Sequence, residues 1–130
     1  MSGRVLLDTN ILIALFAGEV SVLTAAQQAE AVYVPAVALG ELYYGARKSA
    51  RAAANLQRIT ELAAAVAVLP CDGETAAVYG EVKAMLRMRG TPIPENDLWI
   101  AAVARQHELT LVTRDAHFRL VPELACDRWE

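Results

Sequence analysis

The sequence predicts an α/β protein, a three-layer α/β/α sandwich around a mostly parallel central sheet. Short apolar runs rich in β-branched residues alternate with longer segments of helical periodicity. The short runs are apolar on both faces, which is typical of parallel strands that are covered by helices on each side. With 130 residues, 55% of them hydrophobic, and no repeat or Gly/Ser linker, the chain fits a single domain over residues 1–130.

The strand pattern is carried by four segments, and a fifth short strand is expected near residues 125–128. The four segments are residues 5–7, 32–34, 66–69 and 109–112. The helical pattern occupies most of the chain between them. It covers residues 10–17, 20–30, 36–49, 51–65, 74–89 and 95–107. Asp72 is predicted to cap the fifth helix and Gly90 to close it, and residues 91–94 form an extended connector because they hold two prolines.

Composition and charge exclude several classes of protein. The net charge of −3 gives no overall attraction to nucleic acid or anionic membrane, so a polyanionic substrate would need a local basic surface. No apolar run approaches the roughly 20 residues of a membrane helix. Asp8 and Asn10 interrupt the N-terminal apolar stretch, which argues against a signal peptide. Cys71 and Cys126 lack metal-ligand spacing and are expected to be reduced thiols of a cytoplasmic protein.

Four acidic residues occupy positions where the pattern otherwise holds apolar side chains. Asp8 and Asp115 follow the first and fourth predicted strands, Glu41 lies inside the third helix, and Asp97 lies in the first turn of the sixth. By helical periodicity, Glu41 and Asp97 lie on the faces by which their helices pack. A carboxylate in such surroundings is costly unless it is paired, hydrogen-bonded or bound to a metal. Because ligands bind outside the carboxyl ends of parallel strands, we expect the four acids to share one site.

Four neighbouring carboxylates repel one another strongly. At a separation of about 6 Å and an effective dielectric near 20, each pair repels by roughly 3 kcal/mol. Over the cluster this rivals a domain's whole stability of about 5–15 kcal/mol. Either some of the carboxylates hold protons, with raised pKa values, or a divalent cation neutralises them. An all-oxygen ligand set favours Mg²⁺ or Mn²⁺ over zinc, and such an ion suits phosphodiester hydrolysis by activated water.

Basic residues near the acids in the sequence are candidates for holding the phosphate backbone of a nucleic acid. They are Arg47, Lys48, Arg87, Arg89 and Arg114. For any single one of them, an ordinary solvated helix face explains the charge equally well.

The segments that carry the acids resemble the PIN domain family, and more closely the VapC-type toxins of bacterial toxin–antitoxin pairs. The segments are Leu6-Leu7-Asp8-Thr9-Asn10, Glu41-Leu42-Tyr43-Tyr44-Gly45-Ala46, Asn96-Asp97-Leu98-Trp99-Ile100-Ala101-Ala102 and Val112-Thr113-Arg114-Asp115-Ala116-His117-Phe118. The resemblance covers nearly the whole chain, and four motifs in order are far more specific than one. It implies an α/β/α sandwich with the activity of a Mg²⁺- or Mn²⁺-dependent endoribonuclease that cuts tRNA or rRNA.

The resemblance also implies roles for individual residues. The catalytic and metal-binding quartet would be Asp8, Glu41, Asp97 and Asp115. Thr9 and Thr113 would orient carboxylates through their hydroxyls. Some relatives carry a further acid shortly after the fourth. This chain has His117 there, for which a structural or surface role is expected, with contact to substrate or water as the alternative.

The partners implied by the resemblance are an RNA substrate, a second copy of the chain and a protein inhibitor. Toxins of this kind form homodimers and are held inactive by a cognate VapB-like antitoxin, which lies over the toxin groove. Tyr43, Tyr44, Leu56 and Ile59 are apolar candidates for either protein surface, with core packing as the alternative.

Other functions fit the sequence less well. A phospho-receiver domain would need paired acids after the first strand and a late lysine, but no lysine lies beyond Lys83. A phosphatase with a nucleophilic aspartate would want an acid where Asn10 stands, and no phosphate-binding Gly-rich loop is present. The remaining alternative is a catalytically inactive PIN-like scaffold that binds RNA or protein, because a fold does not guarantee activity.

Overall fold

A five-stranded parallel sheet forms the centre of the computed structural model, which describes residues 3–130. The strands are β1 (Arg4–Leu7), β2 (Ala31–Pro35), β3 (Ala67–Leu69), β4 (Thr110–Val112) and β5 (Cys126–Asp127). The helices are α1 (Thr9–Phe16), α2 (Val20–Gln28), α3 (Ala36–Arg47), α4 (Ala52–Ala65), α5 (Gly73–Met88) and α6 (Glu95–Gln106), with a short 3₁₀ helix η1 (Ala116–Leu120). The predicted strands and helices are therefore confirmed, while η1 was not predicted.

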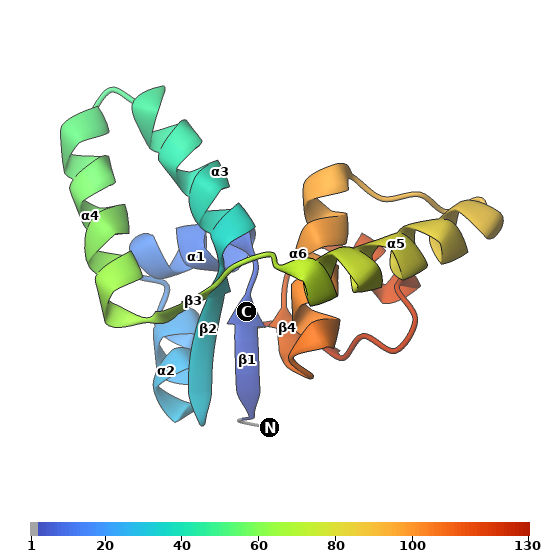
Figure 1. Cartoon of the computed structure of the whole chain (residues 1–130). Coiled ribbons are helices and arrows are strands. Elements are labelled where there is room, and N and C mark those ends of the chain that lie inside the picture. Colours follow the sequence, from blue (N-terminus) through green and yellow to red (C-terminus); the bar gives the residue numbers. More distant parts are fainter. Residues whose placement is uncertain (1–2) are drawn as a thin grey trace.

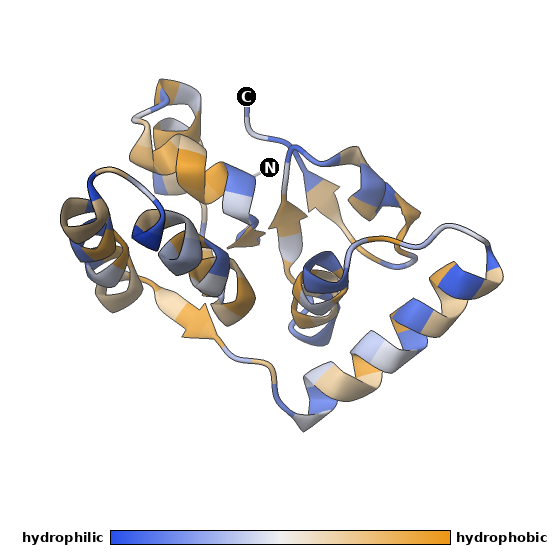
Figure 2. Ribbon diagram, turned by 90° about the horizontal axis from the view of Figure 1, so that it is seen from above, coloured by the Kyte–Doolittle hydropathy of each residue, from blue (hydrophilic) through white to orange (hydrophobic). Residues whose placement is uncertain are grey.

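The sheet has the strand order β3-β2-β1-β4-β5, and each neighbouring pair is parallel. The chain crosses the sheet in one direction from β1 through β2 to β3 and then returns to β4 on the other side of β1. Because crossovers between parallel strands are right-handed, α1 to α4 cover one face and α5 and α6 cover the other. Figures 1 and 2 show these two groups of helices on either side of the strands. The predicted three-layer sandwich is confirmed.

The ends of α5 follow from local sequence. The side chain of Asp72 accepts a hydrogen bond from the backbone N–H of Thr75 at 3.0 Å, and the Thr75 hydroxyl accepts one from the N–H of Asp72 at 2.9 Å. This reciprocal pair satisfies two groups at the helix start. At the other end Gly90 has a φ of +70°, and the N–H of Thr91 bonds the carbonyl of Leu86 at 3.0 Å. Gly90 therefore closes the helix, as predicted, in a conformation that side chains disfavour.

The core lies between the two helical layers and the sheet. Leu6, Leu111 and Ile100, from β1, β4 and α6, are completely buried. In Figure 2 the strands are coloured as hydrophobic, whereas the outer faces of several helices carry hydrophilic residues. Within residues 3–130 no single helix has the length and apolar character to cross a membrane. Only α1 and α2 taken together would pass on those two criteria, and they meet at a bend of 111°.

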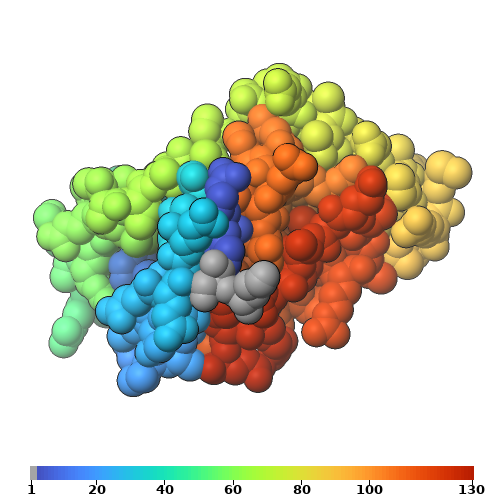
Figure 3. Space-filling model, turned by 90° about the horizontal axis from the view of Figure 1, so that it is seen from below, coloured from blue at the N-terminus to red at the C-terminus, as the bar shows by residue number. Residues whose placement is uncertain are grey.

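The strands of this parallel sheet all begin along one edge and all end along the opposite one. In the space-filling view from below, β1 (dark blue) lies between β2 (cyan) and the segment that leads into β4 (orange) (Figure 3). The opposite edge holds the carboxyl ends of the strands. The chain reverses its direction across the sheet between β1 and β4, and this edge is where open α/β sheets bind ligands.

Candidate metal centre

The carboxyl ends of β1 and β4 place two polar residues side by side. Leu7 pairs with Val112, so that Asp8 and Thr113 are the next residues of the two strands. Both are buried, with 4% and 5% of their surface exposed. Two buried polar side chains at a strand end require hydrogen-bond partners, because leaving such groups unsatisfied costs stability.

Asp8 is held by hydrogen bonds at both carboxylate oxygens. Oδ1 accepts the backbone N–H of Thr9 at 2.8 Å and so caps α1, while Oδ2 accepts the hydroxyl of Thr113 at 2.7 Å. The Thr113 hydroxyl in turn accepts the backbone N–H of Asp115 at 3.0 Å. The same short network therefore orients Asp8 and fixes the start of the segment that carries Asp115.

Glu41 and Asp97 reach this edge from α3 and α6. The hydroxyl of Thr9 donates to Oε1 of Glu41 at 2.7 Å. Burial raises the pKa of Asp8, hydrogen bonds from Thr113 and Thr9 oppose the rise, and the charges of Asp97 and Glu41 add to it. Such mutual effects require the carboxylates to lie close together. The structure therefore brings the predicted quartet to one place, and each of the two threonines donates a hydroxyl to an acid there.

His117 joins this cluster, a contact that the sequence pattern does not predict. Its Nε2 lies 2.7 Å from Oδ2 of Asp97, and its Nδ1 lies 3.1 Å from Oδ1 of Asp115. The ring also packs at a tilt against Phe118, with centroids 4.9 Å apart. The 3₁₀ helix η1 turns the chain directly after Asp115 and brings His117 back toward the acids.

The donor atoms of the cluster fit a divalent cation. One ligand atom from each of Asp97, Asp115 and His117 lies within 4.8 Å of the others. Burial raises the pKa of Asp97, the charge of His117 opposes that rise, and the charges of Asp115 and Glu41 add to it. A cation would relieve this repulsion, and carboxylate oxygens are the ligands that Mg²⁺ and Mn²⁺ favour.

This electrostatic cost predicts how stability depends on pH without metal. The pKa of Asp97 is raised in the folded protein. Above this folded pKa the carboxylate is charged and lowers the free energy of unfolding. Below its ordinary pKa of 3.8 the carboxyl is protonated in both the folded and the unfolded protein, and this destabilisation vanishes. We therefore expect Asp97→Asn to raise the free energy of unfolding at pH 7.5, with a gain that shrinks toward pH 4. Denaturant unfolding in EDTA measures this. A gain that did not change with pH, or a loss at pH 7.5, would contradict it.

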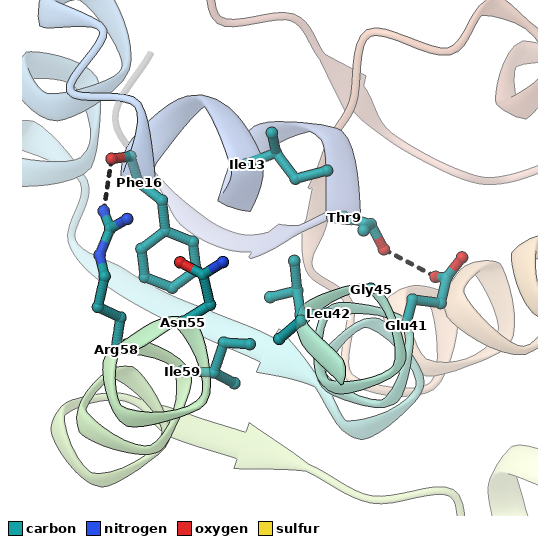
Figure 4. Close-up of a pocket in the computed structure, with 10 residues that line it drawn as sticks. Thr9, Ile13, Phe16, Glu41, Leu42, Gly45, Asn55, Arg58 and Ile59 are labelled. Atoms are coloured by element: carbon teal, nitrogen blue, oxygen red, sulfur yellow. Dashed lines mark hydrogen bonds between the residues drawn. The ribbon is translucent and has the colours of Figure 1, made fainter. Parts of the chain in front are cut away.

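A mainly apolar groove of about 300 Å³ opens beside the acids, between α1, α3 and α4 (Figure 4). Its lining is formed by Thr9, Ile13, Phe16, Glu41, Leu42, Gly45, Ala46, Asn55, Arg58 and Ile59. The bond between Thr9 and Glu41 lies at one end, and at the other Arg58 donates to the carbonyl of Phe16. Ile13 leaves 56% of its surface exposed there. The groove therefore joins an apolar surface directly to the acidic cluster.

The four apolar residues considered for a protein surface differ in how far they are exposed. Tyr44 is 65% exposed, whereas Ile59 is 4% exposed and belongs to the core. Tyr43 and Leu56 are partly buried and pack against the core. Core packing therefore accounts for Ile59, while Tyr44 is open to a partner.

The candidate substrate-binding residues occupy three separate places. Arg114 donates to Glu19 at 2.8 Å and to the carbonyl of Trp129 at 2.9 Å, so it ties α2 and the C-terminal segment to the end of β4. Arg47 and Lys48 lie at the end of α3, and Arg87 and Arg89 at the end of α5. Figure 1 shows these two helix ends on opposite arms of the molecule. The five side chains thus form no single basic patch.

The chain resembles proteins of one family over most of its length, both in sequence and in structure. The family model described as PIN domain matches residues 5–124. A protein of Haemophilus influenzae named Ribonuclease VapC2 is 34% identical over 129 residues, 97% of this chain and 98% of that protein. The tRNA(fMet)-specific endonuclease VapC of Salmonella typhimurium is 31% identical over 97 residues, 74% of each chain. The crystal structure of DNA-bound VapBC from Salmonella typhimurium superposes with a TM-score of 0.91, at 26% identity and full coverage of both chains.

Proposed function

Because this chain belongs to the PIN domain family, we propose that it is a Mg²⁺- or Mn²⁺-dependent endoribonuclease and the toxin of a toxin–antitoxin pair. The observation that carries this proposal is the meeting of Asp8, Glu41, Asp97 and Asp115 at one sheet edge. Relatives over most of the chain's length bear ribonuclease names, which supports hydrolysis of RNA. An inactive scaffold would have no need to keep such a costly cluster of charge.

The residues of the cluster have different parts in the proposed reaction. Asp8, Asp97 and Asp115 would hold the cation, and Thr113 keeps the Asp8 carboxylate turned toward it. The bound ion supplies a water of lowered pKa and a charge that binds phosphate oxygens. Glu41 lies at the mouth of the groove with one oxygen fixed by Thr9, which leaves its other oxygen to orient water or substrate.

The groove beside Glu41 is the proposed site of a VapB-like antitoxin. Its apolar walls suit a helix with an apolar face, and its end at the acidic cluster would let a bound segment cover the metal site. The solved relatives include toxin–antitoxin complexes, which supports a partner of this kind. The exposed Tyr44 lies on the same helix and offers further apolar contact to the antitoxin or to a second copy of the chain in a homodimer.

The proposed substrate is tRNA or rRNA in the cytoplasm. A relative named as a tRNA(fMet)-specific endonuclease supports tRNA as the first substrate to test. The free cysteines Cys71 and Cys126 agree with a reducing compartment. Since the basic residues at the ends of α3 and α5 lie on opposite arms, an RNA that contacted both would have to cross the acidic edge between them.

Removal of metal is expected to abolish cleavage reversibly. Purified protein, free of antitoxin, should cut total RNA in Mg²⁺ or Mn²⁺, lose this activity in excess EDTA, and regain it when either ion is restored. Gel analysis of 5′-labelled RNA fragments measures the effect, and heat-denatured protein is the control for contaminating nucleases. The absence of any cut under both ions would favour the scaffold alternative, and cutting that persisted in EDTA would exclude metal dependence.

A further inference from the structure

We propose that His117 is a nitrogen ligand of the metal ion and makes this site prefer Mn²⁺ to Mg²⁺. The inference rests on the proposed metal-dependent function and deepens it by naming a ligand and the preferred ion.

The first observation is an unsatisfied nitrogen. Nε2 of His117 lies 2.7 Å from Oδ2 of Asp97. It is nevertheless buried without a hydrogen-bond partner within residues 3–130. The ring nitrogen and the carboxylate oxygen are therefore within contact distance but lack the alignment of a regular hydrogen bond. A nitrogen and an oxygen at this separation are also arranged like neighbouring ligands of one ion. Such ligands are about 3.0 Å apart when metal–ligand distances are about 2.1 Å.

The second observation concerns the opposite side of the ring. Nδ1 of His117 lies 3.1 Å from Oδ1 of Asp115. A histidine that binds a metal through one nitrogen usually directs its other N–H to a carboxylate or carbonyl, which fixes the ring. The completely buried Phe118 packs against the ring, with the two planes inclined at 44°. His117 is therefore oriented on two sides, with Nε2 facing the acids.

Ligand chemistry sets the preference between the two ions. Mg²⁺ is a hard cation that is bound mainly by oxygen and keeps several of its waters. Mn²⁺ shares the preference for carboxylate oxygen but, as a first-row transition metal, also belongs to the ions that bind at sites with nitrogen ligands. A site in which His117 joins the carboxylates of Asp8, Asp97 and Asp115 would thus discriminate between the two ions, whereas the carboxylates alone would do so far less.

The decisive experiment is pulsed electron paramagnetic resonance on the full-length protein loaded with Mn²⁺. We expect a ¹⁴N coupling from a directly bound imidazole in the natural protein and in His107→Ala, which removes the chain's other histidine. The coupling should vanish in His117→Ala. In the same samples, His117→Ala should weaken Mn²⁺ binding roughly 10- to 100-fold. Mutation of residues that only hydrogen-bond to metal ligands already lowers metal affinity by about this factor. Mg²⁺ binding, measured by competition, should change by less than about threefold, because Mg²⁺ is held mainly by oxygen ligands, which the substitution leaves in place.

The outcomes separate the two proposals. Bound Mn²⁺ without a ¹⁴N coupling in the natural protein would overturn ligation by His117 and leave the metal-dependent function standing. A coupling that persisted in His117→Ala would overturn it equally. Failure of the natural protein to bind either ion would instead remove the proposed function. Since the natural protein alone gives the first result, the test stands even if a variant folds poorly, and His117→Asn provides a second variant of similar size.

Discussion

Replacing Asp97 with asparagine is expected to slow RNA cleavage by about 1000-fold, which corresponds to roughly 4 kcal/mol of transition-state stabilisation. The change keeps the size of the side chain but removes the charge that would hold the cation. Among the described residues, the Asp97 carboxylate contacts His117 and serves as no helix cap, so the fold does not depend on it. The loss should therefore appear in chemistry and metal binding, while the free energy of unfolding without metal should rise, as predicted above from the raised pKa of Asp97.

Single-turnover cleavage of labelled tRNA in saturating Mn²⁺ measures this effect. Glu74→Gln is a matched control, because Glu74 also lies in the first turn of a helix, α5, but away from the cluster. We expect the control to cleave at the natural rate and both variants to give the circular dichroism of the natural protein. Undiminished cleavage by Asp97→Asn would count directly against the metal mechanism.

Replacing Phe118 with alanine is expected to lower the free energy of unfolding by about 3–5 kcal/mol. Phe118 is completely buried and is the largest fully buried side chain among residues 3–130. Its removal would leave a cavity beneath η1 and take away the ring on which His117 packs. Against a typical domain stability of about 5–15 kcal/mol, this loss is a large fraction of the total.

Urea unfolding followed by circular dichroism gives the measurement. Leu120→Ala, in the same 3₁₀ helix but with 41% of its surface exposed, is the control and should cost less than about 1 kcal/mol. Equal losses from the two variants would show that η1 is not anchored through Phe118. Metal binding by folded Phe118→Ala protein should weaken as well, because the ring of His117 loses its support.

The elements could be predicted from the sequence where the periodicity is long or the strands are apolar on both faces. Residues 5–7, 32–34 and 109–112 show the strand pattern clearly, and each lies within or overlaps an observed strand. The five residues of η1 are too few for a periodic pattern, so the turn after Asp115 was missed. The contacts of His117 with Asp97 and Asp115 could not be predicted for the same reason, since its position depends on that turn.

The candidate site was predictable in its acids but not in its surroundings. Asp8 and Thr113 follow adjacent strands, so their meeting follows from topology once the sheet is known. The partner of Arg114 is Glu19, which is 95 residues away, and no local pattern indicates that pair. Sequence proximity also misled for Arg47, because six residues along a helix carry it about 9 Å from Glu41.

The convergence of the acids on one cation is tested most directly by anomalous diffraction at the manganese edge from crystals grown with Mn²⁺. The account predicts a peak about 2.0–2.4 Å from carboxylate oxygens of Asp8 and Asp97, in the range for oxygen ligands of divalent ions. No peak there, at Mn²⁺ concentrations that support cleavage, would contradict it, as would a peak bound only to residues away from this sheet edge.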